Sequence, residues 1–140
     1  MASRRSASSS NEGLNARVKE ALDRTEIMAL STLGPDGSWT SPVQFRFNDK
    51  LELFFLSMPE AKHVHNIIRD ARVSVAIYSH PGPPGGNLGL QIKGRAEPQS
   101  EDSSPGGWQS FRIIPEEVWC FDSRVFGHER RRVNTSELQL

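Results

Sequence analysis

The chain has 140 residues, a length that suits one domain, since single domains usually contain about 100–200 residues. Seventeen basic and seventeen acidic side chains leave no formal net charge, which argues against nucleic acid or a membrane surface as the partner. A single cysteine, Cys120, excludes an internal disulfide and a multi-cysteine metal site, and the lack of a long apolar run leads us to expect a soluble cytoplasmic protein.

The two ends of the chain predict tails around one domain. Residues 1–13 are rich in serine and lack an apolar period, so we expect a disordered N-terminal tail. From Leu14 to Arg24 the apolar residues form one stripe with charges opposite, which predicts a short amphipathic helix. The domain is expected to cover residues 14–133, followed by a flexible C-terminal tail over 134–140.

An antiparallel hairpin is predicted next. The apolar stretch Ile27–Leu33 is followed by turn residues over Gly34–Ser38, and Trp39–Phe47 then alternates like a strand. Pro42 cannot donate a hydrogen bond to a neighbouring strand, which places it at an edge or an irregularity. The exposed backbone beside this proline could contact a ligand ring. Alternatively, Pro42 could simply prevent the edge strand from pairing with another chain.

The stretch Leu51–Tyr78 predicts a strand, a helix and a second strand, with Pro59 in the first turn of the helix. The apolar stripe of this helix is expected to contain Ala61, Val64, Ile67 and Ile68. Lys62 and His63 fall in its first turn, where the helix dipole favours anions. Free N–H groups, Lys62 and the Ser57 hydroxyl would make a phosphate site, although a solvated lysine on a surface helix is the alternative.

The remaining chain predicts more strands. A loop rich in proline and glycine covers residues 79–87, and Leu88–Pro98 returns to strand period with Gly94 on the apolar face, a mark of a bulge or a close backbone approach. Two short strands are expected over Trp108–Ile114 and Val118–Asp122. Three antiparallel strands, a helix and a fourth strand indicate a mainly β, α+β domain built as a small barrel or meander. No dinucleotide fingerprint or metal-ligand spacing appears in the sequence.

Four stretches also resemble one known family. They are Leu30–Val43 with its DG…P pattern, Phe55–His63 followed by Arg72–Val75, Leu90–Gly94, and Ile114–Phe121 followed by Gly127–Arg130. Their order and spacing resemble the pyridoxamine 5′-phosphate oxidase-like superfamily of FMN-binding split barrels over about Leu22–Val133. The resemblance implies an antiparallel split β-barrel of six to seven strands with two to three short helices.

The resemblance also implies a function and an assembly. We expect an FMN-dependent oxidoreductase that transfers a hydride or electrons to or from an unknown small molecule, working as a homodimer with the cofactor at the interface. A deazaflavin-dependent reductase with the same barrel is the alternative, as is a flavin- or haem-binding protein without turnover. A small barrel that binds single-stranded nucleic acid is disfavoured by the zero net charge.

The residues that the resemblance assigns to the cofactor come from five segments, and no catalytic residue or metal ligand is assigned. They are Ser41, Pro42, Val43, Gln44, Leu56, Ser57, Lys62, His63, Gln91, Trp108, Phe121 and Arg130. Lys62 and Ser57 would hold the phosphate, and residues 41–44 would lie along the ring. Gln91 and Arg130 would come from the second chain or from the closing segment, while Trp108 and Phe121 either stack near the open face or belong to the barrel and dimer core.

The chain departs from the vitamin B6 oxidases at two places. Phe126 stands where those oxidases have the first arginine of their closing run, which helps to hold the pyridoxal substrate. The residues that clamp the substrate phosphate have no clear match in the loop over 79–87. We therefore expect a substrate other than a vitamin B6 phosphate.

Overall fold

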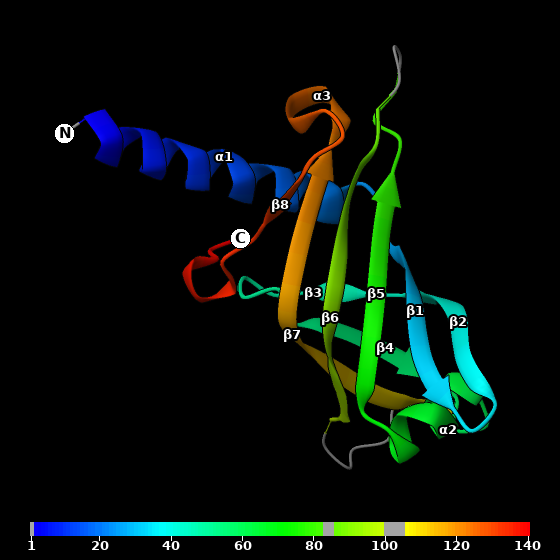
Figure 1. The fold of residues 1–140 in the computed structure, drawn as a ribbon. Helices are drawn as coiled ribbons and strands as arrows, with labels where there is room; N and C mark the ends of the chain where they lie inside the picture. The colour runs from blue at the N-terminus through cyan, green and yellow to red at the C-terminus, as the bar shows by residue number, and fades with distance from the viewer. Residues whose placement is uncertain (1, 83–85, 100–105) are drawn as a thin grey trace.

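One curled antiparallel sheet forms most of the molecule (Figure 1). A computed structural model describes residues 2–82, 86–99 and 106–140, with side chains from Gly13 onwards, and these contain eight strands. The strands are β1 (Ile27–Gly34), β2 (Gly37–Gln44), β3 (Arg46–Phe47), β4 (Leu53–Ser57), β5 (Arg72–Ser79), β6 (Leu88–Pro98), β7 (Gln109–Asp122) and β8 (Arg130–Arg132). Their order is β2-β1-β5-β6-β7-β4-β3, with β8 paired to β7, so the sheet is the expected split barrel.

The core lies inside this curl, where the alternate side chains of each strand are buried. In β5, Val73, Val75 and Ile77 are buried between exposed neighbours, as the period of two predicts. The largest fully buried apolar side chains are Met28, Leu30, Leu51, Leu53, Ile77, Leu88, Leu90, Phe111, Ile113, Val18 and Val118. Within the described residues, no helix is both long and apolar enough to cross a membrane.

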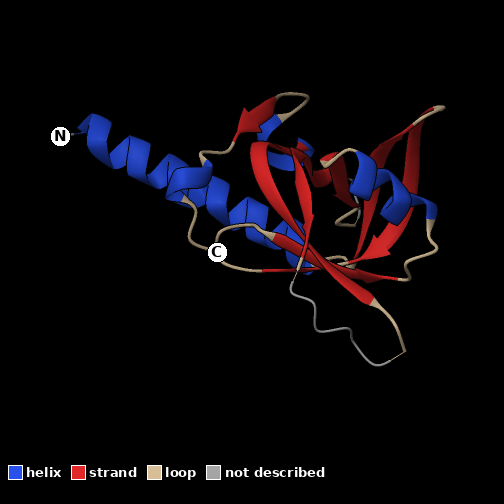
Figure 2. Ribbon diagram, turned by 90° about the horizontal axis from the view of Figure 1, so that it is seen from below, coloured by secondary structure: helices blue, strands red, loops and turns tan. Residues whose placement is uncertain are grey.

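In the described part of the chain, three α-helices and one 3-10 helix accompany the sheet: α1 (Ala2–Asp23), α2 (Lys62–Arg69), α3 (Ser123–Phe126) and η1 (Thr135–Glu137). Figures 1 and 2 place α1 and α2 on opposite sides of the barrel. Helix α1 buries Val18, Ala21 and Leu22 against the core, as its apolar stripe predicts. The helix begins at Ala2, whereas the sequence predicted disorder over 1–13. No proline interrupts residues 2–13, and Gly13 costs only about 1 kcal/mol in a helix interior, so the packed half of the helix can extend through them.

Two predicted boundaries in the central stretch were wrong by a few residues. Strand β4 begins at Leu53 because Leu51 has a positive φ of 64°, which breaks the extended chain. Helix α2 begins at Lys62 and not at Pro59, since the chain turns first through a hydrogen bond from the Ala61 N–H to the Met58 carbonyl (3.0 Å). Lys62 and His63 still occupy the first turn, as predicted.

The closing half of the chain contains one long strand where two were predicted. Strand β7 continues through Pro115, because the register against β6 shifts between Lys93 and Gly94 and leaves Glu116 as the extra residue of a bulge. A Cβ on Gly94 would lie 2.4 Å from the Ile114 carbonyl oxygen, which confirms the predicted close backbone approach. Residues 83–85 and 100–105, in two predicted loops, lie outside the described residues.

The C-terminal segment is not a free tail, contrary to the expectation for residues 134–140. Leu138 is buried in the core cluster, and the Leu140 N–H donates to the Asp49 carbonyl oxygen (3.1 Å). Asn134 caps the 3-10 helix by accepting from the Ser136 N–H (3.1 Å). Burial of the Leu138 side chain contributes a free energy that offsets the conformational entropy lost when the segment becomes ordered. A purely polar tail would have no such contribution.

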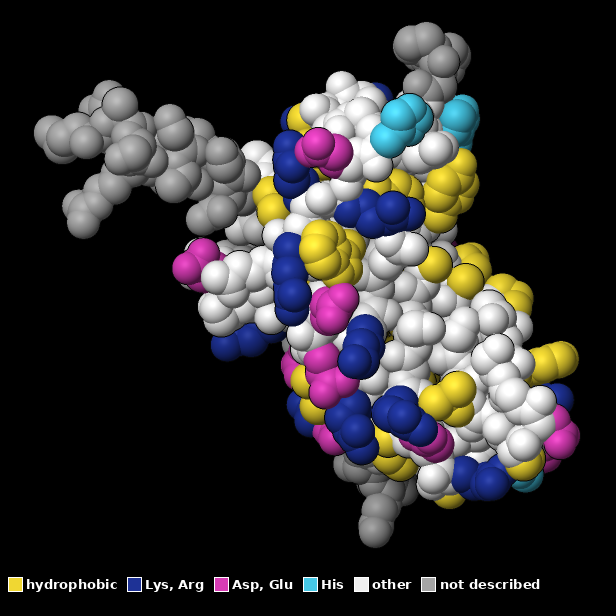
Figure 3. All heavy atoms as spheres, viewed as in Figure 1, with side chains coloured by type: hydrophobic (Ala, Val, Ile, Leu, Met, Phe, Trp, Pro, Cys, Tyr) yellow, Lys and Arg dark blue, Asp and Glu magenta, His cyan; other side chains and the backbone are white. Residues whose placement is uncertain are grey.

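The side of strands β2, β1, β5, β6, β7 and β8 that is turned away from the core faces outward, and we call it the outer face. One row of it runs in register across six strands: Pro42, Ala29, Ala76, Gln91, Trp119 and Arg132. Apolar side chains lie exposed on the same face, with Ile27 43% and Tyr78 55% exposed. Figure 3 shows hydrophobic, basic and acidic side chains mixed over this surface.

A buried contact joins α2 to the β1–β2 hairpin and gives a stability prediction. A Cβ on Gly34 would lie 2.8 Å from Oδ1 of the buried Asn66, so Gly34→Ala should destabilise the fold by about 1–3 kcal/mol through overpacking. In an Asn66→Ala background the same substitution should cost less by about 0.5 kcal/mol or more, because the clashing atom is gone. Urea unfolding of the four proteins measures both effects. Gly13→Ala, with no atom within 4 Å, is the matched control and should not destabilise the protein.

Candidate functional site

The start of helix α2 is open to an anion. Ala61 is the N-cap residue in an extended conformation, its side chain makes no capping hydrogen bond, and the first turn carries no acidic residue. Backbone N–H groups at such a start carry a partial positive charge. Lys62 adds a full positive charge at the first helical position, so the local field here favours a negatively charged ligand.

Ser57 and His63 form a hydrogen-bonded pair beside this helix start. The Ser57 Oγ lies 2.7 Å from the His63 Nε2, and Ser57 is only 5% exposed. Burial lowers the pKa of His63 below its ordinary value of 6.5, so the ring is neutral at pH 7. The Phe55 ring, 6.2 Å from the His63 ring centroid, forms part of its apolar surroundings.

Lys62 lies over an aromatic ring from the hairpin. Its Nζ is 4.2 Å from the centroid of the Trp39 ring, and both side chains are exposed. Within the described part of the chain, no carboxylate oxygen lies within 4.0 Å of this ammonium. The positive charge at the helix start is therefore held in place without being neutralised.

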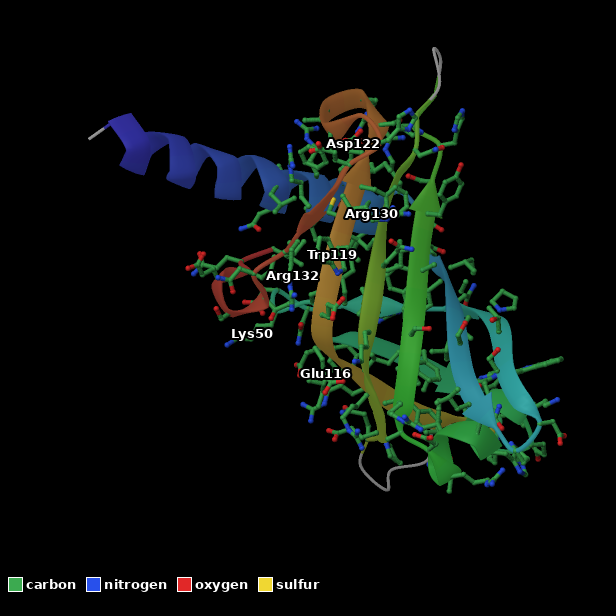
Figure 4. The ribbon with its side chains drawn as sticks, in the orientation of Figure 1. Lys50, Glu116, Trp119, Asp122, Arg130 and Arg132 are labelled. Carbon is green, nitrogen blue, oxygen red and sulfur yellow. The ribbon has the colours of Figure 1, made fainter. Side chains whose placement is uncertain are left out.

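A second group of predicted residues lies on the outer face at the other end of β7. The Arg130 Nε donates to the Gln91 Oε1 (2.6 Å), and its guanidinium carbon is 5.9 Å from the Phe121 ring centroid. The Phe121 ring stacks with Tyr78 at 6.5 Å and lies over Gly89, where a Cβ would be 2.5 Å from its Cζ. Figure 4 shows Arg130, Trp119 and Arg132 along this side of β7 and β8.

The same end of the barrel is anchored by a buried carboxylate. Asp122 is fully buried and accepts from the Arg124 backbone N–H (3.0 Å) and from its Nε (2.9 Å). The Arg124 hydrogen bonds hold the pKa of Asp122 below its ordinary value of 3.8. Arg124 also donates to Glu20 of α1 (2.9 Å), so the turn that leads into β8 and Arg130 is fixed to the N-terminal helix.

Other predicted residues have mixed positions. In β2, Pro42 and Gln44 are exposed on the outer face, Ser41 is half-buried and Val43 is buried inside the barrel. Leu56 is exposed on β4. Trp108 precedes the first residue of β7, whereas Phe121 is near its last residue, so one chain does not stack these two rings together.

The predicted residues thus form two groups within one chain. Ser57 pairs with Gln109 at the start of β7, while Gln91 and Arg130 pair with Trp119 and Phe121 near its end. The sequence prediction missed Trp39 and Tyr78, the aromatic neighbour of each group. No sequence signal marks them, because the Lys62–Trp39 and Phe121–Tyr78 contacts join separate elements.

Two hollows also open on the surface. One of about 320 Å³ is lined by Glu116, Glu117 and residues 132–135, and the other of about 530 Å³ lies between α1 and the segment 125–132. Neither hollow is lined by a residue of the predicted cofactor set.

His63 gives a prediction about pH. Its folded-state pKa is lowered, so the stability it contributes is complete above pH 6.5 and is lost as the pH falls through the folded value. Unfolding in urea between about pH 7 and pH 5 should show a smaller loss of stability for His63→Gln than for the wild type. Identical pH profiles for the two proteins would contradict the assignment of this loss to His63.

Comparison with known proteins places the chain in a family. Residues 14–132 match the sequence profile described as pyridoxamine 5′-phosphate oxidase. Among curated protein sequences, none matches closely enough to count as a relative.

Several solved structures share the fold. A FAD-binding protein from Mesorhizobium loti is 20% identical, with 76% of this chain and 93% of that chain covered and a TM-score of 0.66. A haem-binding protein from Mycobacterium smegmatis is 18% identical, with 87% and 57% covered and a TM-score of 0.66. A haem-storage protein from Vibrio cholerae is 18% identical, with 71% and 89% covered and a TM-score of 0.62. Since the profile match spans most of its length, the chain belongs to the pyridoxamine 5′-phosphate oxidase family.

Proposed function

We propose that the protein binds FMN at the interface of a homodimer and acts as an oxidoreductase on a small molecule. The observation that carries the proposal is the gathering of Lys62 and the Ser57–His63 pair at the uncapped start of α2. These residues fit a phosphate dianion, because N–H groups, an ammonium and a hydroxyl can all donate to its oxygens. A family that includes flavin enzymes makes the phosphate of FMN the natural ligand.

The outer face fits the flat ring. Pro42 lies in one row with Ala29 and Ala76, so the face offers small side chains over two strand spacings, about 10 Å. A planar, largely apolar ring can lie against such a surface without displacing side chains. When bound, FMN supplies hydride or electron transfer, and the protein orients the ring.

Two copies of the chain would complete the site. The residues proposed to hold the phosphate, at the start of α2, and the Gln91–Arg130 pair lie at different ends of β7. One chain therefore cannot present both to one cofactor as tightly as two chains can. The exposed apolar side chains of the outer face, Ile27, Leu33 and Tyr78 among them, support an interface there. A two-fold dimer would bring the Arg130 of one protomer toward the Lys62 of its partner at two equivalent sites.

The absorbance spectrum of the purified protein tests the proposed cofactor directly. The expected result is a yellow protein that shows the two absorbance bands of an oxidised flavin and releases FMN when it is denatured. Release of FAD or a deazaflavin would replace FMN by another flavin. A Soret band would overturn the proposal in favour of haem, the ligand of two of the structural neighbours.

The role of Lys62 gives a quantitative prediction. Lys62→Ala removes one charge-assisted hydrogen bond, worth roughly 1.5–3 kcal/mol, and should weaken FMN binding by about 10- to 150-fold. Riboflavin, which lacks the phosphate, should bind wild type and variant almost equally in a flavin fluorescence titration. Lys50→Ala, at an exposed lysine in a distant turn, is the matched control. Equal losses for both ligands would show that Lys62 supports the ring or the fold instead.

The substrate prediction concerns Phe126. Its half-buried ring packs on the core and lies 5.1 Å from the Arg131 guanidinium carbon, so it cannot replace the arginine that holds pyridoxal in the vitamin B6 oxidases. Oxidation of pyridoxamine 5′-phosphate by the FMN-loaded protein should be absent or slow. Turnover at about 1 per second or faster, measured by product absorbance, would show that this departure does not exclude the substrate.

A further inference from the structure

The contact between Lys62 and Trp39 holds together two elements that the sheet does not pair. Lys62 begins α2, and Trp39 lies in β2 near the hairpin turn. The Trp39 side chain is 44% exposed although its position in the strand alternation is on the inner side. Its ring is therefore free to lie under the ammonium at the helix start (4.2 Å from Nζ to ring centroid).

A chain of buried polar contacts fixes the two residues relative to each other. The Asn66 Nδ2 of α2 donates to the Thr32 Oγ1 of β1 (3.0 Å), and this hydroxyl donates to the Trp39 carbonyl oxygen (3.4 Å). Thr32 and Asn66 are 1% and 3% exposed. The backbone of Trp39 and the helix that carries Lys62 are thus tied through one buried hydroxyl.

An aromatic partner suits a lysine that must bind a phosphate. A carboxylate would hold the ammonium equally well, but its negative charge would neutralise the lysine and repel the incoming dianion. The face of an indole attracts the cation through its quadrupole and carries no net charge. It also limits the rotamers of a long side chain that would otherwise lose this freedom only when the ligand binds.

We propose that Trp39 is a positioning residue for Lys62, which it holds at the start of α2 ready for a phosphorylated cofactor. This role rests on the proposed binding of FMN phosphate by Lys62. Trp39 acts through the lysine, so its contribution is confined to ligands that carry the phosphate. A cation–π contact at an exposed site corresponds to a change in affinity of about two- to fivefold.

The test measures FMN and riboflavin dissociation constants for the wild type, Trp39→Leu, Trp39→Phe, Lys62→Ala and the double variant Trp39→Leu/Lys62→Ala. Trp39→Leu should weaken FMN binding by about two- to fivefold and leave riboflavin binding unchanged. Trp39→Phe should recover most of the loss, because it keeps an aromatic face. In the Lys62→Ala background, Trp39→Leu should have no further effect on FMN.

The outcomes separate this inference from the function on which it rests. If the wild type binds FMN with a preference over riboflavin that Lys62→Ala abolishes but Trp39→Leu leaves intact, the positioning role is wrong and the proposed function stands. The role is also wrong if Trp39→Leu weakens riboflavin binding as much as FMN binding. It is equally wrong if Trp39→Leu weakens FMN binding as much in the Lys62→Ala background as in the wild type. In either case Trp39 would act on the flavin ring and not through Lys62. If the wild type binds no FMN, the proposed function fails and the role of Trp39 fails with it. Urea unfolding of each variant verifies that it is folded.

Discussion

The buried hydrogen bond from the Asn66 amide to the Thr32 hydroxyl (3.0 Å) holds helix α2 against the β1–β2 hairpin. Gly34 permits this contact, because a side chain there would collide with the Asn66 amide. The position of α2 in turn decides where the first turn of the helix points, and so where Lys62 and His63 lie relative to β4 and β2. Breaking such a bond would leave a polar group buried without a partner, which costs more than the bond itself contributes. The end of the molecule that we propose to bind the phosphate therefore depends on a contact outside the proposed site.

The sheet gives the second constraint on the site. Strand β7 is one long strand that bends at a bulge. Gln109, at its first residue, pairs with Ser57, whereas Trp119 and Phe121, near its other end, pair with Gln91 and Arg130. The bulge opposite Gly94 bends β7 without interrupting it. The sheet can therefore curl, with its inner face around the core and its outer face toward solvent. The exposed apolar side chains of the outer face and its two separate groups of polar residues are the observations behind the proposed site shared between two protomers.

Sequence reasoning succeeded where local rules act alone. The period of two in β5, the bulge at Gly94 and the place of Lys62 and His63 in a helical first turn were all read from neighbouring residues, and the family resemblance supplied the barrel. It failed where distant contacts decide. Ile68 was assigned to the apolar stripe of α2 but is 62% exposed, while Asn66 is buried because Thr32 accepts its hydrogen bond. The continuity of β7 through Pro115, the packing of Leu138 and the contact between Trp39 and Lys62 likewise depend on partners far along the chain.

The central claim, that each cofactor site takes residues from both protomers, can be tested with a mixed dimer. One chain would carry Lys62→Ala and the other Arg130→Ala, each with its own affinity tag, and the heterodimer would be isolated through both tags after co-expression. In a shared site one of the two clefts then contains both substitutions and the other contains neither. We predict about one tightly bound FMN per heterodimer, against two per wild-type dimer, at a concentration where neither variant homodimer binds. A heterodimer that binds no more FMN than the two variant homodimers would contradict the shared site.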